Sequence, residues 1–194
     1  MHATKLFIAT IALSVSTLAY GQTYSGVQSQ DVEKWVREIR QEYNLVKSRI
    51  STLEKDGYAG ELFCMHTIDN KYGKSYPAVG EYRAETFYYY ELEANFPPRL
   101  RMVIETTISA GNKAYFEALY NENGEVLFLF EQSSYDNNRA KRLYYSEGKI
   151  IRYSENNVEK RLDTMSDVTL DEVIWTSRAA TAHKTRFDLF YEAE

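Results

Sequence analysis

The chain has 194 residues, a net charge of −5 at pH 7 and a single cysteine. A mildly acidic chain without basic clusters does not suit nucleic acid or an anionic membrane surface as a partner. One cysteine excludes an intramolecular disulfide, so the chain is not a small scaffold held together by disulfides.

The N-terminus has the pattern of a secretory signal peptide. A positive start ends at Lys5, an apolar run covers Leu6–Ala19, and the small residues of Ala19–Gly21 suit a cleavage site. The run is shorter than the about 20 residues of a membrane-spanning helix, and no cysteine follows it to carry a lipid. A buried N-terminal helix is the alternative, but the run has no polar face. We therefore expect residues 1–21 to be removed and residues 22–194 to form a single exported domain, periplasmic or extracellular, with neither a lipid anchor nor a membrane span.

Residues 29–55 have the periodicity of an amphipathic helix. Ser29 or Asp31 can cap its start, and Asp56-Gly57 predicts its end. The same pattern over about three heptads would also suit a coiled coil, but a helix lying on its own sheet is favoured. The apolar stripe consists of Val32, Val36, Ile39, Tyr43, Val46, Ile50 and Leu53.

Seven strands are predicted after this helix. Short connections between the later ones indicate an antiparallel meander. Three strands cover residues 61–68, 81–92 and 99–108, and four more form two tandem hairpins within residues 113–154.

The two hairpins have strong turn signals at Asn123-Gly124 and Glu147-Gly148. Such a pair predicts a two-residue type I′ turn, in which both central residues have positive φ. Pairing Asn121 with Val126 then sorts the side chains of the first hairpin into two faces, both largely apolar. The sheet must therefore be covered on both sides, or curl so that one face closes on itself. One face holds Phe116, Ala118, Tyr120, Leu127 and Leu129; the other holds Tyr115, Leu119, Phe128 and Phe130.

A second helix is predicted near the C-terminus. Thr169 and Glu172 form a capping-box pattern at its start. The expected fold class is α+β: an N-terminal amphipathic helix packed on a curved antiparallel β-meander of about seven strands, with a C-terminal helix. The apolar stripe expected on this second helix consists of Leu170, Val173, Ile174, Ser177, Thr181, Lys184, Phe187 and Tyr191.

Catalytic and metal-binding patterns are sparse. Cys64 and His66 can share a strand face, but no second pair completes a zinc set, and we expect a buried, inert Cys64 and a locally hydrogen-bonded His66. No motif for nucleophilic catalysis or phosphate binding is present in the sequence. We therefore predict no catalytic residue, no metal and no cofactor. A carboxylate pair remains an alternative for catalysis, drawn from Glu81, Glu85, Glu91, Glu93, Glu117 and Glu131.

Aromatic residues are the most distinctive feature, with 17 tyrosines in the chain. Tyrosine is a favoured strand residue, but it also stacks on sugars and anchors protein interfaces. Arg142 and Arg152 lie beside tyrosines and could form a cation–π rim. The candidate ligand-binding residues are Tyr88, Tyr90, Tyr144 and Arg152.

The hairpin segments 120–130 and 143–153 resemble those of a group of small exported proteins of Bacteroidetes type. The helix segment 39–43 and the stretch 77–82 are also similar to that group, and the likeness covers most of residues 30–155. The resemblance implies export and a fold of one helix followed by hairpins. It carries over no functional residue.

These patterns favour an exported, non-catalytic binding or interaction protein of the cell envelope. Its partner would be a protein or a glycan, bound through an aromatic face or an uncovered sheet edge. The alternatives are a small envelope hydrolase, using a carboxylate pair or Cys64 with His66, and a carrier of an apolar small molecule within the curved sheet.

Overall fold

The computed structural model describes residues 29–77, 80–94 and 96–192, and the predicted signal peptide at residues 1–21 lies outside them. The helices are α1 (Ser29–Asp56) and α2 (Asp167–Glu192), with two short 3-10 helices, η1 (Ser134–Asp136) and η2 (Leu162–Thr164). The strands are β1 (Leu62–Asp69), β2 (Ser75–Tyr76), β3 (Gly80–Glu91), β4 (Arg99–Ser109), β5 (Asn112–Tyr120), β6 (Val126–Ser133), β7 (Arg139–Ser146), β8 (Lys149–Glu155) and β9 (Val158–Lys160).

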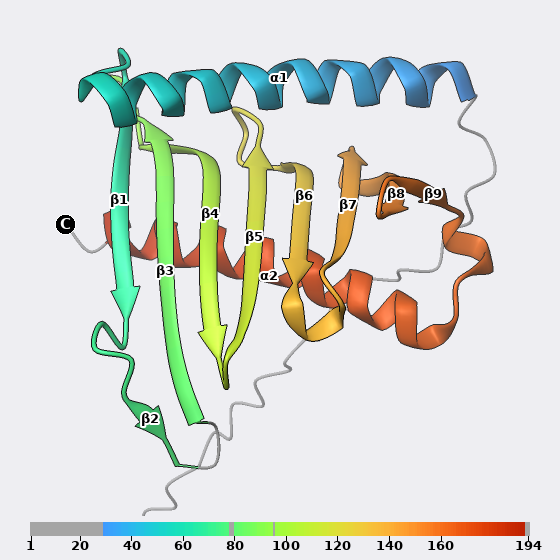
Figure 1. The fold of residues 1–194 in the computed structure, drawn as a ribbon. Helices are drawn as coiled ribbons and strands as arrows, with labels where there is room; N and C mark the ends of the chain where they lie inside the picture. Colours follow the sequence, from blue (N-terminus) through green and yellow to red (C-terminus); the bar gives the residue numbers. More distant parts are fainter. Residues whose placement is uncertain (1–28, 78–79, 95, 193–194) are drawn as a thin grey trace, which may run out of the picture.

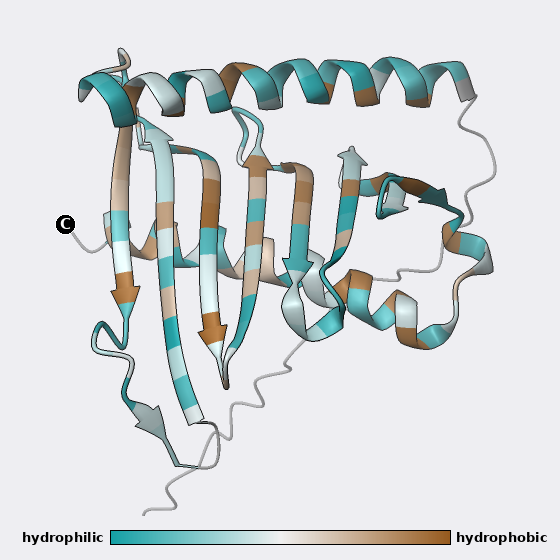
Figure 2. Ribbon diagram, in the orientation of Figure 1, coloured by the Kyte–Doolittle hydropathy of each residue, from teal (hydrophilic) through white to brown (hydrophobic). Residues whose placement is uncertain are grey.

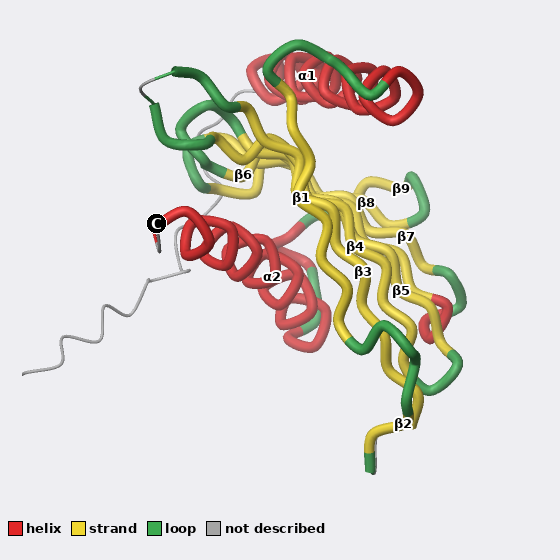
Figure 3. Tube along the Cα trace, turned by 90° about the vertical axis from the view of Figure 1, so that its left-hand side faces the viewer, coloured by secondary structure: helices red, strands yellow, loops and turns green. Residues whose placement is uncertain are grey.

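The described elements form three layers, with the sheet between the two helices (Figures 1 and 3). All strand pairs are antiparallel, in the order β1-β3-β4-β5-β6-β7-β8-β9, and β2 pairs with β3. The predicted α+β meander is thus confirmed, with nine strands rather than seven. The two additional strands, β2 and β9, are two and three residues long, too short to show the alternation that predicts a strand.

Helix α1 matches the prediction closely. Every residue of its predicted apolar stripe packs into one core with the sheet, and polar residues cover the outer face (Figure 2). The helix ends where Gly57, at φ +71°, donates its N–H to the Leu53 carbonyl over 2.8 Å. A left-handed residue of this kind is a common helix stop, and glycine adopts it without a steric penalty.

Each face of the sheet has its own hydrophobic core, so the expectation that both sides must be covered is confirmed. On the α1 side the helix packs on Met102, Leu119 and Phe128. On the α2 side, Val173 and Phe187 of the helix belong to the other cluster. Burying a side chain of this size stabilises the fold by about 1.5–3 kcal/mol. Sheet-facing members of the α2 core include Tyr88, Leu100, Val103, Ala118, Tyr120 and Leu143.

The C-terminal helix begins earlier than predicted. The capping-box assignment at Thr169 is wrong, because Thr169 lies in the first turn of α2 and donates its N–H to the Ser166 hydroxyl over 3.3 Å. Glu172 forms an ion pair with Arg139 instead of capping the helix. The stripe is also only partly right, since Leu170 and Thr181 are exposed. The buried residues of α2 are Val173, Thr176, Ala180, His183 and Phe187.

The two hairpin turns differ from each other. Glu147 and Gly148 both have positive φ, and Ser146 pairs with Lys149, as a two-residue type I′ turn requires. The same prediction is wrong for the first hairpin, where only Gly124 of the turn has positive φ.

The first turn is longer because hydrogen bonds from Asn121 span it. The N–H of Asn121 donates to the Glu125 carbonyl over 2.9 Å, and its side-chain oxygen accepts from the N–H groups of Asn123 and Glu125. The register shifts by one residue at Tyr120, and Leu127 packs on the α1 side rather than the predicted α2 side. The other predicted face assignments of this hairpin are correct.

Candidate ligand-binding groove

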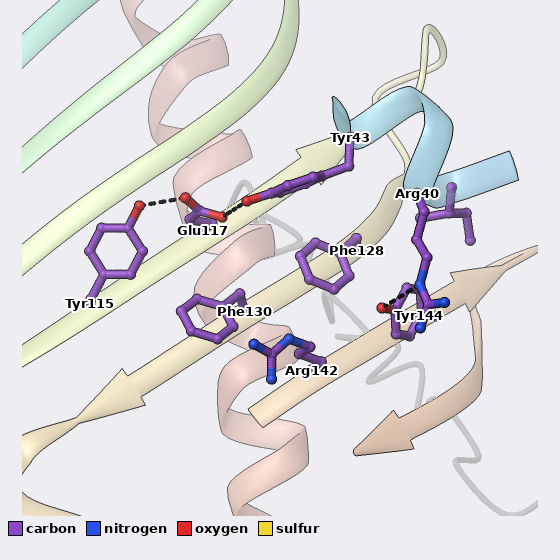
Figure 4. A pocket seen from close by; sticks show the side chains of 9 residues that line it. Arg40, Tyr43, Tyr115, Glu117, Phe128, Phe130, Arg142 and Tyr144 are labelled. Carbon is purple, nitrogen blue, oxygen red and sulfur yellow. Dashed lines mark hydrogen bonds between the residues drawn. The ribbon is translucent and has the colours of Figure 1, made fainter. Parts of the chain in front are cut away.

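A pocket of about 330 Å³ lies between α1 and the sheet. Helix α1 runs across one end of the strands, roughly perpendicular to them, and no other described helix covers the rest of this face (Figure 1). We call this pocket the α1 groove. Its lining comes from α1 (Ile39, Arg40, Tyr43), β5 (Tyr115, Glu117), β6 (Phe128, Phe130) and β7 (Arg142, Tyr144) (Figure 4).

Strand geometry places the sheet residues of the groove on one face. Side chains two residues apart on a strand point the same way, which aligns Tyr115 with Glu117 and Arg142 with Tyr144. Phe130 of β6 pairs with Glu117 of β5 and with Arg142 of β7, so these three residues are neighbours across the three strands. Helix α1 supplies the remaining wall.

Glu117 is the polar centre of the groove. It is almost fully buried and accepts hydrogen bonds from the Tyr43 hydroxyl at 2.6 Å, the Lys47 ammonium at 2.8 Å and the Tyr115 hydroxyl. Burial alone would raise its pKa, but these donors together hold the pKa of Glu117 below its ordinary value. Burial and the carboxylate raise the pKa values of both tyrosines, which keeps their hydroxyls protonated. The carboxylate is therefore a fixed acceptor.

Arg142 lies beside this centre without an ionic partner among the described residues. Its guanidinium carbon is 4.9 Å from the centre of the Phe130 ring, a cation–π contact. The Nη1 atom is buried and has no hydrogen-bond partner in the described part of the chain. A buried donor of this kind normally has a partner, so the group marks a place where an acceptor can bind.

Arg40 reaches the groove from α1. Its Nε donates to the Tyr144 hydroxyl over 3.3 Å, and its guanidinium carbon lies 5.5 Å from the centre of the same ring. Its hydrogen-bond partner is thus a neutral hydroxyl, and its positive charge is not neutralised by that contact.

A second pocket of about 280 Å³ adjoins the α1 groove. The two pockets share Arg40, Arg142 and Tyr144, and the second extends to Arg152 on β8. Arg152 differs from the other two arginines because it forms ion pairs with Glu33 and, at 3.3 Å, with Glu159.

The structure divides the four predicted ligand-binding residues between the two faces of the sheet. Tyr144 and Arg152 lie together on the α1 side. Tyr88 is fully buried under α2, with its hydroxyl 3.3 Å from Nδ1 of His183. Tyr90 packs against Phe187 on the same side, at 5.4 Å between ring centres. Tyr88 therefore belongs to the α2 core, since the alternation along β3 directs both tyrosines towards α2.

Sequence reasoning missed the part of the groove that α1 contributes. The predicted apolar stripe assigned Tyr43 to the core and did not include Arg40. A cation–π contact was expected between Arg142 and a neighbouring tyrosine, whereas its ring partner in the structure is Phe130. No pattern in the sequence tells which part of a helix will lie over which strand.

Cys64 and His66 do not form a reactive pair. Cys64 is exposed, so the prediction of a buried thiol is wrong; it lies on β1, an edge strand that α1 leaves partly uncovered. Partial desolvation of the sulfur, with a contribution from the Glu54 carboxylate, raises the pKa of the thiol to about 11. His66 Nε2 lies 2.9 Å from Glu85, and the imidazole stacks on Phe87 at 4.2 Å.

The predicted strand carboxylates mostly have cationic partners. Glu91 forms ion pairs with Arg101 at 2.9 Å, Arg99 at 3.2 Å and Arg49. Arg49 and Arg101 hold the pKa of Glu91 below its ordinary value despite its burial. Across the described ranges, no group of three or more His, Cys, Asp or Glu side chains is placed to hold a metal ion.

Neither described helix has an apolar stretch that is long enough to cross a membrane. In comparisons with known proteins, no family model, curated protein or solved structure matches this chain.

Proposed function

We propose that this protein is an exported, non-catalytic binding protein of the cell envelope that holds its ligand in the α1 groove. One observation carries the proposal: the Arg142 guanidinium has a buried nitrogen with no hydrogen-bond partner among the described residues, in a pocket lined by aromatic rings. A charged donor left without a partner is costly, and a ligand that supplies an acceptor relieves that cost.

The shape of the groove supports binding. Its volume of about 330 Å³ is at the lower end of the usual range for small-ligand pockets, about 300–1,000 Å³. The contacts of Glu117 with Tyr43 and Lys47 join α1 to β5, so the two walls are held in place before a ligand arrives. Preorganisation of this kind lowers the entropic cost of binding.

Two features favour binding over hydrolysis. The carboxylates of Glu117 and Glu91 are ionised and fully engaged by cations or hydroxyls, whereas a general acid needs a raised pKa. The Cys64 thiol has a raised pKa, whereas a nucleophilic cysteine needs a lowered one. For the carrier alternative, the described sheet is open, with β1 and β9 as its outer strands, and the α1 groove carries charges that do not suit an apolar ligand.

The test is a ligand search followed by mapping. The protein without residues 1–21 is applied to a glycan array and to an envelope extract, and a retained ligand is titrated by NMR. We expect the largest shift changes at the backbone amides of Phe130, Arg142 and Tyr144. Shifts confined to α2 or to the edge strands would contradict the assignment of the groove. The absence of any retained ligand at micromolar protein would contradict the binding function itself.

A further inference from the structure

The α1 groove and the adjoining pocket concentrate positive charge on an acidic chain. Three arginines and two carboxylates, Glu117 and Glu159, line them, although the whole protein has a net charge of −5. Of the three arginines, Arg152 alone has carboxylate partners within the described part of the chain. Arg142 and Arg40 are not neutralised by any ion pair among the described residues. Because the excess charge is local and lies in a pocket, it favours an anionic ligand.

The guanidinium of Arg142 suits a planar anion. An arginine offers donors in a rigid fork that matches the two oxygens of a carboxylate. The Phe130 ring covers one side of the Arg142 guanidinium, and Arg142 contributes to the lining of both pockets. Arg40 reaches the same lining from α1, with its guanidinium at Tyr144 (Figure 4).

The two tyrosyl hydroxyls of the groove specify a second chemical property of the ligand. Tyr43 and Tyr115 both donate their hydroxyl hydrogens to Glu117. Each hydroxyl has one hydrogen, so the oxygen that remains available to a ligand can only accept. A ligand that satisfies these oxygens must itself carry O–H or N–H donors, which a fatty acid chain lacks.

The rings of the groove add an apolar surface. Tyr115 and Phe130 meet edge to face, with their centres 6.0 Å apart, and both are half-buried on the groove side of the sheet. Aromatic rings of this kind pack against the C–H faces of sugar rings. A hydroxyl-bearing ring with a carboxylate therefore matches all three properties: the cationic fork, the accepting oxygens and the aromatic surface.

We infer that the α1 groove binds an acidic saccharide, with the sugar carboxylate on Arg142 and Arg40 and the sugar hydroxyls donating to Tyr43 and Tyr115. This inference rests on the proposed binding function and names its ligand class.

The experiment compares a trimer of galacturonic acid with a neutral trimer of galactose by isothermal titration calorimetry, on the protein without residues 1–21. We expect the acidic trimer to bind at least about tenfold more tightly than the neutral one. Arg142→Gln should remove most of this preference, and Tyr115→Phe should weaken binding of both trimers by a few-fold. Arg161→Gln is the matched control, because it removes one positive charge at a residue whose side chain is 77% exposed and paired only with Asp163 among the described residues.

The outcomes separate the inference from the function on which it rests. Equal binding of the two trimers, or equal effects of Arg142→Gln and Arg161→Gln, would overturn the acidic ligand and leave a groove that binds neutral ligands. If an acidic peptide binds and neither trimer does, the assignment of a saccharide as the ligand class is overturned. If Arg142→Gln does not fold, the comparison of the two trimers on the unmodified sequence still tests whether the groove prefers an acidic ligand.

Discussion

The Tyr43 hydroxyl on α1 donates to the Glu117 carboxylate on β5 over 2.6 Å. This bond joins the first helix to a central strand and forms one wall of the α1 groove. Lys47, one helical turn further along α1, donates to the other oxygen of the same carboxylate at 2.8 Å. The position of α1 on the sheet therefore depends on polar contacts as well as on its apolar stripe.

Tyr43→Phe should destabilise the fold by about 1–3 kcal/mol, because it removes a hydrogen bond to a charged, buried acceptor. The measurement is urea denaturation followed by circular dichroism. Tyr135→Phe is the control, since Tyr135 is 83% exposed, and it should change nothing. An equal effect of the two substitutions would show that the bond to Glu117 does not contribute to stability.

The contribution of Glu117 to stability should depend on pH. Its pKa is lowered in the folded state, so the unfolded chain binds the proton more readily. The stabilisation is then fully present above about pH 5 and is lost as the pH falls through the folded pKa. Comparison of the original sequence with Glu117→Gln by urea denaturation should give a difference that is constant from pH 7 to about pH 5 and shrinks below it. A difference that shrinks already above pH 6 would contradict this assignment.

Gly148→Ala should destabilise the protein by about 1–2 kcal/mol, because Gly148 has φ +71° and an alanine is strained there. Gly148→Asn is the informative comparison, since asparagine tolerates left-handed backbone better than alanine. We expect thermal unfolding to rank the three proteins as glycine, asparagine, alanine. An alanine variant as stable as the glycine form would rule out the type I′ turn.

Cys64 should react slowly with alkylating reagents despite its exposure. A thiol with a pKa of about 11 is almost entirely protonated at neutral pH, and the thiolate is the nucleophile. The rate of iodoacetamide labelling, followed by mass spectrometry, should rise about tenfold per pH unit up to about pH 11. The urea-unfolded chain provides the reference, with an ordinary thiol pKa. Labelling of the folded protein as fast as that of the unfolded chain at pH 7.5 would refute the raised pKa.

Export should remove residues 1–21. The full chain, expressed in a bacterium, is expected in the periplasm or the medium with Gln22 as its first residue, as measured by intact mass. Ile11→Asp places a charge in the apolar run and should keep the unprocessed chain inside the cell. Recovery of the full-length chain outside the cytoplasm would contradict cleavage at this site.

The elements that were predicted well depend on local patterns. The apolar stripe of α1, from Val32 to Leu53, follows the helical period, and Gly57 ends the helix by its own backbone preference. The Glu147-Gly148 turn sets the pairing beside it in the same local way, and the register of the second hairpin shifts by one residue between Tyr145 and Tyr144. The apolar character of both sheet faces required cover on both sides, whichever register was chosen. The start of α2 was predicted wrongly. Glu172 forms ion pairs with Arg139 and Lys141 and therefore does not cap the helix.

The sequence by itself determined helix α1, the longer strands, most of the hairpin pairing and the need for cover on both faces of the sheet. It did so because side-chain periods of 3.6 and 2 show which face of a helix or strand a residue occupies. Only the tertiary structure decided where along the strands α1 lies, and so which residues face one another. That placement brings Arg40 and Tyr43 to Glu117 and Arg142, while Tyr88 is buried under α2 on the opposite face. Periodicity carries no information on the position at which two elements cross, since that depends on packing and polar contacts between residues as far apart as Tyr43 and Glu117.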